Sequence, residues 1–91
     1  MSSADERPVL VTGAGGFIGG HLVCALLADG FAVRAVDIKS FSHWHQRHDN
    51  AENVVADLRL RDAAFAAVAG TRSVFNLAAD MGGMGFIENN K

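Results

Sequence analysis

The residues of this 91-residue chain that point most clearly to a chemical task form a glycine-rich turn near the N-terminus. The segment from Val11 to Gly20 reads VTGAGGFIGG, and its glycines fit a G-x-x-G-x-x-G spacing at Gly13, Gly16 and Gly19. Such glycines let the chain leave a strand in a tight turn and bring backbone N–H groups close to a phosphate. The helix that follows adds an N-terminus that attracts anions. The turn therefore predicts a binding site for a pyrophosphate.

An acidic side chain follows the turn at a suitable distance. Asp37 lies about 18 residues after Gly19, at the end of an apolar run. A carboxylate there accepts hydrogen bonds from ribose hydroxyls and repels a 2′-phosphate, which favours NAD over NADP. Arg34 and Lys39 are nearby cations that can accept such a phosphate, so NADP stays open as an alternative. The other alternative is a tight turn that binds nothing.

A second acid, Asp57, ends another apolar run and precedes Leu58. At that strand end, the carboxylate or a neighbouring backbone group can read the exocyclic amine of an adenine. Asp57 can equally act as a helix cap or a solvated turn acid. The residues alone leave both interpretations open.

These residues need strands and helices that place them together. Apolar runs over 9–12, 31–36, 54–56 and 73–78 predict four strands, and helical spacing predicts helices over 17–29 and 61–69. Gly30 and Gly70 stand where helix-ending glycines belong. The polar stretch 39–52 predicts a loop, with room for one helical turn. The apolar stripe of the first helix is expected to consist of Ile18, Leu22, Ala25 and Leu26, widened by Leu27.

Alternating strands and crossovers predict the α/β class, with a Rossmann-type parallel sheet in the order 3-2-1-4. In such a sheet, ligands bind beyond the carboxyl ends of the strands, where the strand order reverses. The glycine turn and both acids fall at those ends.

Composition restricts the remaining possibilities. The net charge is −2 and the hydrophobic fraction is 49%, which gives no electrostatic footprint for nucleic acid or an anionic membrane. No apolar run is long enough to cross a membrane, and the first seven residues lack the apolar core of a signal peptide. A single cysteine, Cys24, excludes an internal disulfide and suits a reducing compartment. We therefore expect a cytoplasmic protein with a disordered tail over 1–7 and one domain over 8–91.

The segment Thr12–Gly19 resembles the glycine motif of the extended short-chain dehydrogenases/reductases, the NAD-dependent epimerase/dehydratase family. Asp57-Leu58 and the run NLAA over 76–79 are similar to the family's adenine-contacting and fourth-strand segments. The run VFNLAADMGGMGFI over 74–87 is similar to the branch of the family that epimerises GDP-mannose. The resemblance covers nearly all of the chain from Val9 onward.

The resemblance implies a reaction in which bound NAD transiently oxidises C4 of a nucleotide-sugar, acid/base groups invert C3 and C5, and the hydride returns. It also implies that Gly82 contacts the nucleotide-sugar, with GDP-mannose as the expected substrate. A sugar 4-epimerase, a 4,6-dehydratase and a non-catalytic dinucleotide-binding module remain as alternatives. Carried over position by position, the cofactor-binding residues are Gly13, Gly16, Phe17, Ile18, Asp37, Asp57, Leu58, Ala78 and Ala79.

The chain departs from the family pattern where catalysis is concerned. It contains no tyrosine, so the family's Tyr-x-x-x-Lys pair is absent. The family's catalytic cysteine also has no counterpart, because Cys24 falls in the first predicted helix. We therefore predict no catalytic residue within this chain and interpret it as the N-terminal part of a Rossmann domain, truncated at its C-terminal end. Alone it should be inactive, whereas the complete enzyme should be a homodimer.

Three further features are expected to matter less. His43, His45 and His48 have a spacing that occurs around metals, but no rigid element orients them, so a solvated loop is favoured and no metal is expected. Cys24 should be a core or boundary thiol. Trp44 could cover a cofactor edge or a partner surface, and the sequence does not decide between these.

Overall fold

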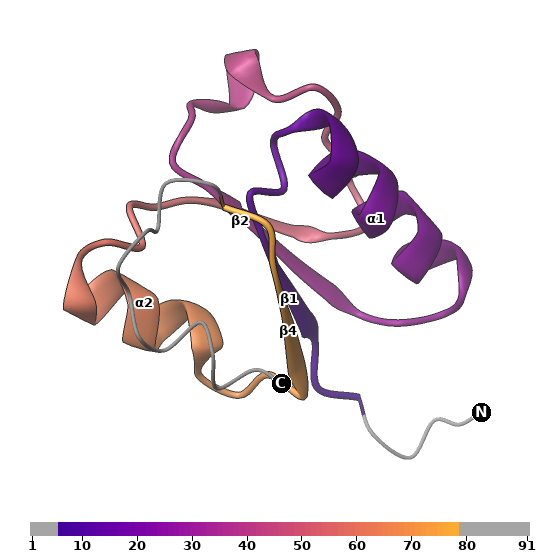
Figure 1. Ribbon diagram of the computed structural model, residues 1–91. Coiled ribbons are helices and arrows are strands. Elements are labelled where there is room, and N and C mark those ends of the chain that lie inside the picture. The colour runs from indigo at the N-terminus through magenta and orange to yellow at the C-terminus, as the bar shows by residue number, and fades with distance from the viewer. Residues whose placement is uncertain (1–5, 79–91) are drawn as a thin grey trace.

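The computed structural model describes residues 6–78 of the chain, so the predicted site residues Ala79 and Gly82 and most of the predicted tail lie outside the described part. Figure 1 shows strands and helices alternating along these residues. In chain order the elements are β1 (Val9–Thr12), α1 (Phe17–Ala28), β2 (Val33–Asp37), the 3₁₀ helix η1 (Phe41–His43), β3 (Glu52–Val55), α2 (Arg61–Val68) and β4 (Ser73–Asn76).

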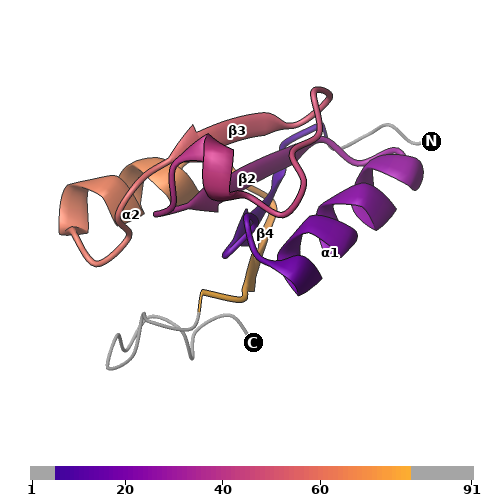
Figure 2. The same ribbon diagram turned by 90° about the horizontal axis from the view of Figure 1, so that it is seen from above.

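The four strands form one parallel sheet in the order β3-β2-β1-β4, which confirms the predicted fold class and strand order. Thr12, the last residue of β1, pairs with Val36 of β2 on one side and with Asn76 of β4 on the other. The carboxyl ends of the strands therefore lie at one edge of the sheet. Figures 1 and 2 show α1 covering one face and α2 covering the other.

Every residue of β1 is buried because both faces of this central strand are covered. Alternate side chains point to opposite faces, so Val11 packs with Val23 of α1 while Leu10 packs with Ala67 of α2. This explains why the run VLVT is apolar almost throughout instead of alternating with polar residues. The strand that leads into the glycine turn is thus the most firmly held part of the sheet.

The buried face of α1 matches the predicted stripe in part, because Leu22, Leu26 and Leu27 pack against the core as expected. Gly19, Gly20 and Val23 are buried, whereas Ile18 is 68% exposed and Ala25 also faces outward. A Cβ on Gly19 would overlap the carbonyl oxygen of Gly13, so this face of the helix must lie against the turn. The prediction was wrong for Ile18 and Ala25, because it weighted apolar side chains and did not consider that glycines allow the closest approach.

The ends of β2 and β4 are set by the residues of β1 with which they pair, and not by the ends of their own apolar runs. β2 begins at Val33 instead of Phe31, because its pairing starts opposite Val9. β3 covers 52–55 instead of 54–56, and β4 ends at Asn76 because β1 ends opposite it at Thr12.

Cys24 is exposed on α1, which corrects the expected core or boundary position. Within residues 6–78, the structure has no helix long and apolar enough to span a membrane.

Arg34 ties α2 to the sheet at the end opposite the glycine turn. Its Nη1 donates hydrogen bonds to the carbonyl oxygens of Ala67 and Ala69, at 2.7 and 2.8 Å. Its Nε donates to Glu52 Oε1 on β3 at 3.0 Å. A cation at a helix C-terminus satisfies carbonyls that have no partner within the helix. Arg34 therefore does not lie where a cofactor phosphate could reach it, unlike Lys39.

Candidate functional site

A cleft of about 360 Å³ opens at the carboxyl ends of the strands. Its walls come from Gly13 and Gly16 of the glycine turn and from three strand ends, residues 36–39 after β2, 56–59 after β3 and 77–78 after β4. This is the edge at which ligands bind in open α/β sheets. The fold thus collects at one place residues as far apart in sequence as Gly13 and Ala78.

Gly13 is a glycine that the fold itself requires. Its φ of +71° lies in the left-handed region, and a Cβ there would lie 2.8 Å from the carbonyl carbon of Leu77. Leu77 and Ala78 form the adjacent wall of the cleft. The backbone of β1 and the chain after β4 can approach this closely only because Gly13 has no side chain.

Gly16 is different, because nothing in the described structure requires a glycine there. Its φ is −81°, and the sole protein atom within 4 Å of a Cβ would be the Gly13 oxygen, at an ordinary 3.5 Å. Gly16 lines the cleft and is the N-cap of α1. The missing side chain leaves open space at the N-terminus of α1. A bound pyrophosphate would need this space to reach the first N–H groups of the helix.

The N-terminus of α1 is free to receive an anion. No side chain caps the helix, and its first turn carries no acidic residue. The first N–H groups of a helix have no intrahelical partner and carry the positive end of its dipole. Phe17 and Ile18 supply the first of these groups. Their side chains are exposed and do not line the cleft, which is compatible with a role played by the backbone.

Asp37 is the acid closest to the glycine turn. It is buried, its Oδ2 accepts a hydrogen bond from the Gly15 N–H at 2.9 Å, and its Oδ1 accepts one from the Lys39 N–H at 3.0 Å. A carboxylate has about four acceptor positions, so two remain for ligand hydroxyls. Asp37 therefore fixes the turn and still faces the cleft as an acceptor. A Cβ on Gly15 would also come within 3.1 Å of Oδ2.

Asp57 is bound by its own neighbour. Its Oδ1 accepts hydrogen bonds from the N–H and the Nε of Arg59, at 3.0 and 2.9 Å, and its Oδ2 accepts one from Nη2 at 3.0 Å. The Arg59 guanidinium therefore holds the pKa of the Asp57 carboxyl below its ordinary value. Leu60, not Asp57, is the N-cap of α2. Asp57 is thus a turn acid that also lines the cleft beside the buried Leu58.

Thr12 connects the turn to the far wall of the cleft. Its buried hydroxyl donates to Asn76 Oδ1 at 2.5 Å and accepts the Leu77 N–H at 3.0 Å and the Ala78 N–H at 3.3 Å. One side chain at the end of β1 therefore fixes the chain that leaves β4. Thr12 was not among the predicted site residues, although its hydroxyl stands at a strand end inside an apolar run.

The structure brings most of the predicted residues together. Cleft-lining positions include six of them, namely Gly13, Gly16, Asp37, Asp57, Leu58 and Ala78. Phe17 and Ile18 lie at the adjacent helix start, and Ala79 and Gly82 fall outside the described residues. Ile38, Arg59 and Leu77 also line the cleft although they were not predicted to, and Lys39 was predicted solely as a possible phosphate acceptor. All four follow strand ends, so the strand order itself could have identified them.

The histidine loop does not gather into a cluster of ligands. Among residues 6–78, no three His, Cys, Asp or Glu side chains lie together as a metal site would require. His45 packs edge-on against Phe17, with ring centroids 4.9 Å apart, and His43 Nδ1 lies 3.0 Å from Ser40 Oγ. Trp44 is buried in the core instead of covering a cofactor edge or a partner surface.

The fold and the cleft define a nucleotide-binding protein of the Rossmann type. A family model described as the NAD dependent epimerase/dehydratase family matches residues 9–90. The chain belongs to this family, whose cofactor is NAD.

Known proteins support the same assignment. The chain is 44% identical over 87 residues to GDP-mannose 3,5-epimerase 1 of Oryza sativa subsp. japonica, an alignment that covers 96% of this chain and 23% of the rice protein. It resembles an NAD-bound short-chain dehydrogenase/reductase superfamily protein of Agrobacterium tumefaciens, with a TM-score of 0.67 and 28% identity over 92% of this chain and 24% of that one. MoeE5 in complex with UDP-glucose and NAD gives a TM-score of 0.61 and 35% identity over 77% of this chain and 21% of its own. The chain thus spans about a quarter of the length of these relatives.

Proposed function

We propose that residues 8–91 form the NAD-binding N-terminal part of a nucleotide-sugar epimerase similar to GDP-mannose 3,5-epimerase. The observation that carries the NAD site is Gly16, an open position at the start of α1 that the fold does not require to be glycine. The substrate follows from the similarity to the rice enzyme across 96% of the chain. A reducing compartment such as the cytoplasm fits the free, exposed thiol of Cys24.

Different residues in and beside the cleft are proposed to bind different parts of the cofactor. The N–H groups of Phe17 and Ile18, beside Gly16, hold the pyrophosphate at the N-terminus of α1. Asp37 accepts the hydroxyls of the adenosine ribose, and its charge excludes a 2′-phosphate.

The adenine lies toward the end of β3. Ile38 and Leu58 provide apolar walls there, and the polar groups around Asp57 and Arg59 lie at the edge.

The second wall of the cleft extends toward the reacting part of the cofactor. We assign Ala78 to the floor where the cofactor crosses the end of β1. By resemblance to the family, Ala79 is assigned to the same floor and Gly82 to the nucleotide-sugar, and both lie outside the described residues. When bound, NAD supplies the hydride acceptor and donor for transient oxidation at C4, which acidifies the protons at C3 and C5. The family's catalytic cysteine has no counterpart here, since Cys24 lies in α1, so the acid/base groups for those protons are proposed to come from outside this chain. The complete enzyme is proposed to be a homodimer.

The variant Gly16→Ala tests the cofactor site. Apart from its chain neighbours, the methyl group would meet no described protein atom closer than 3.5 Å, so the free energy of unfolding should change by less than about 1 kcal/mol, the usual helix-end range. Its affinity for NAD, measured by calorimetry, should fall at least tenfold, about the factor that 1.4 kcal/mol gives. Gly19→Ala is the matched control for a glycine that the fold requires, and it should lose stability. Unchanged NAD affinity in Gly16→Ala would refute this placement of the pyrophosphate.

The epimerase proposal needs a separate measurement. GDP-mannose incubated with NAD and the 91-residue chain in deuterated buffer should show no exchange at C3 or C5 by NMR, because acid/base residues are missing. The intact mass of the gene product from its source should be several times 9.6 kDa, and that product should exchange both protons. Exchange catalysed by the 91-residue chain would overturn the proposed division of labour.

A further inference from the structure

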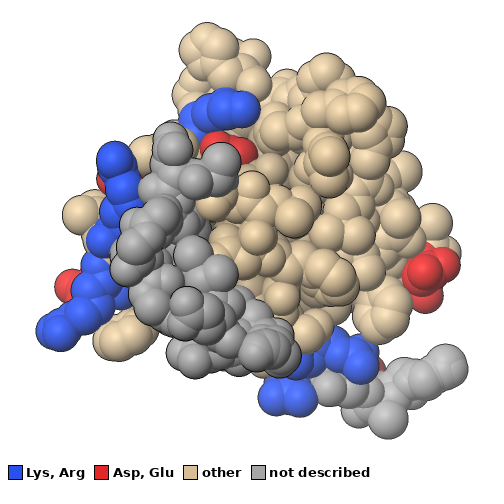
Figure 3. Space-filling view, viewed as in Figure 1, with Lys and Arg blue, Asp and Glu red and all other residues tan. Residues whose placement is uncertain are grey.

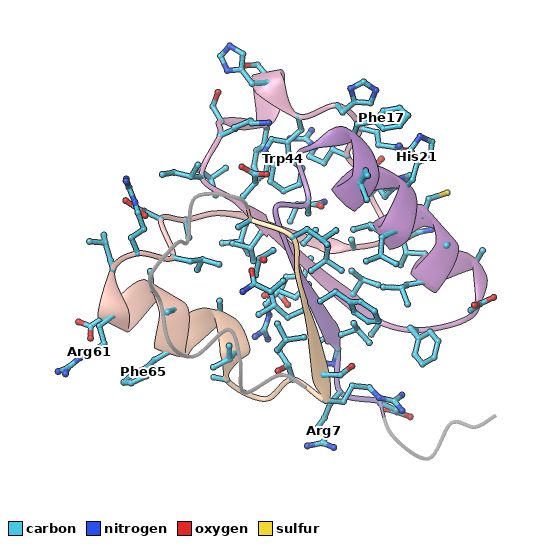
Figure 4. The ribbon with its side chains drawn as sticks, viewed as in Figure 1. Arg7, Phe17, His21, Trp44, Arg61 and Phe65 are labelled. Carbon is cyan, nitrogen blue, oxygen red and sulfur yellow. The ribbon has the colours of Figure 1, made fainter. Side chains whose placement is uncertain are left out.

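Trp44, which the proposed cofactor site does not use, lies against the glycine turn. The residue is 8% exposed and packs in the same buried cluster as Val11 and Ala14. Its indole Nε1 donates a hydrogen bond to the Lys39 carbonyl oxygen at 2.9 Å. Figure 4 shows Trp44 between the segment that follows β2 and the start of α1.

The contact between Trp44 and Gly15 leaves no space for a side chain. A Cβ on Gly15 would lie 2.8 Å from both Cγ and Cδ1 of the indole, closer than real Cβ atoms approach other atoms. The indole ring therefore rests directly on the backbone of the turn. Gly15 is the residue before Gly16, the N-cap of α1.

Two hydrogen bonds hold the same glycine from the same side of the chain. The Gly15 N–H donates to Asp37 Oδ2 at 2.9 Å, and its carbonyl oxygen accepts the His45 N–H at 2.7 Å. Residues of the segment 37–45 thus contact Gly15 in three ways. Asp37 accepts its N–H, His45 donates to its carbonyl oxygen, and Trp44 packs where a side chain would stand. The ring of Phe41 packs edge-on against the indole of Trp44, with ring centroids 5.0 Å apart.

We propose that Trp44 is a positioning residue for NAD. By filling the space over Gly15, the indole fixes the turn in the conformation that presents Gly16 and the first N–H groups of α1 to the diphosphate. This inference rests on the proposed NAD site. The ribose contact depends less on Trp44, because Asp37 is also anchored by the Lys39 N–H at 3.0 Å.

A purely structural role and a positioning role make different predictions. Loss of a core side chain lowers the folded fraction and weakens every ligand in the same proportion. Loss of a positioning side chain weakens ligands that carry a diphosphate and spares those that do not. Groups in a binding site are sensitive to displacements of about 1 Å, so a turn that relaxes into the space left by the indole should show this selectivity.

The test compares ADP with adenosine on the 91-residue chain, using calorimetry at a temperature where each variant is folded. For Trp44→Leu we expect the ADP affinity to fall about tenfold while the adenosine affinity stays within about twofold. Trp44→Phe keeps a ring over Gly15 and should retain most of the ADP affinity. Val33→Ala is the matched control, since Val33 belongs to the same buried cluster but starts β2, away from the turn. It should lower the melting temperature and leave the ratio of the two affinities unchanged.

The outcomes separate this inference from the function on which it rests. A wild-type chain that binds neither NAD nor ADP would overturn the proposed NAD site and the role of Trp44 with it. Wild-type binding with an unchanged ADP-to-adenosine ratio in folded Trp44→Leu would overturn the role of Trp44 alone. If Trp44→Leu does not fold, Trp44→Met decides in the same way, because it fills much of the volume without a ring.

Discussion

Asp37 shows how one side chain can serve both the fold and the ligand. Its carboxylate accepts the N–H groups of Gly15 and Lys39, which places it at the cleft with acceptor capacity to spare. A neutral amide at the same place would lose the negative charge that repels a 2′-phosphate. Lys39, which lines the same cleft, would then be the nearest cation for that phosphate.

The variant Asp37→Asn should therefore change the choice of cofactor. NAD affinity should fall about tenfold, since hydrogen bonds to a charged acceptor contribute about 1.5–3 kcal/mol. NADP affinity should stay level or rise, so that the ratio measured by calorimetry moves toward NADP. Asp29→Asn makes the same chemical change at an exposed position after α1 and should leave the ratio untouched. An unaltered ratio in Asp37→Asn would mean that this acid does not select the cofactor.

Asp57 allows a prediction about pH. Hydrogen bonds from Arg59 lower its pKa below the ordinary 3.8, so the carboxyl is charged throughout the neutral range. A lowered folded-state pKa stabilises the fold above the pKa of the unfolded chain, and this contribution is lost as the pH falls through the lowered value. In Arg59→Gln, a carboxyl NMR titration should show the pKa of Asp57 rising toward 3.8. The exposed Arg61→Gln serves as the control, and a wild-type titration at or above 3.8 would contradict the ion pair.

The sequence was informative about single residues where geometry leaves few choices. Gly13 and Asp37 were predicted because a positive φ and a strand-end acceptor each restrict the residue type. The role of Trp44 could not be predicted, because its contact with Gly15 depends on the path of the loop around η1. That path is not encoded in a local sequence pattern. Whether Asp57 meets adenine or closes a turn was also beyond sequence reasoning, since its bond to Arg59 depends on side-chain conformation.

At the scale of elements, the strands were predictable and the orientation of α1 was not. Continuous apolar runs identify buried parallel strands, and their alternation with helices fixes the order β3-β2-β1-β4. The rotation of α1 about its axis depends on Gly19, whose missing side chain lets the helix touch the Gly13 carbonyl. Hydrophobic patterns do not register such a contact, so Ile18 was placed in the core although it is exposed.

The guanidinium of Arg34 adds polar contacts to the apolar packing of α2 against the sheet. Arg34→Met keeps the apolar stem but removes the hydrogen bonds to Ala67 and Ala69 and the ion pair with Glu52. We expect the free energy of unfolding in urea to fall by about 1.5–3 kcal/mol, the range for hydrogen bonds to a charged group. NAD affinity should not change, because Arg34 is not part of the cleft. Arg61→Met on the exposed face of α2 should be nearly neutral; an equal effect there would refute the role of Arg34.

At the scale of the whole molecule, the main feature is the edge of the sheet formed by β4, which leaves apolar side chains exposed to solvent. Within the described residues β4 pairs with β1 alone, and Phe75 and Leu77 are 42% and 39% exposed. Figure 3 shows the described Lys and Arg side chains at the margins of this view, and β4 itself contains no charged residue. At the other edge of the sheet, β3 carries Glu52, which is paired with Arg34. Uncharged apolar edges invite pairing with another chain.

The 91-residue chain should therefore self-associate, with sedimentation coefficients that rise with concentration. Phe75→Lys should keep the chain monomeric, because a charged edge resists strand addition. Phe65→Lys removes an equally large apolar side chain, 64% exposed, from α2 and should not prevent association. A wild-type chain that remains a monomer at high concentration would show that the edge is protected in some other way.

The cleft has a property that depends on the order in which a chain is made. Each of its lining residues lies between Gly13 and Ala78, and none has to wait for a distant segment. Proteins are synthesised from the N-terminus, and domains begin to fold during synthesis. A nucleotide that binds the native state stabilises it in proportion to the logarithm of its concentration. If NAD binds this cleft as proposed, it can stabilise the four strands as soon as the chain has been synthesised as far as Ala78.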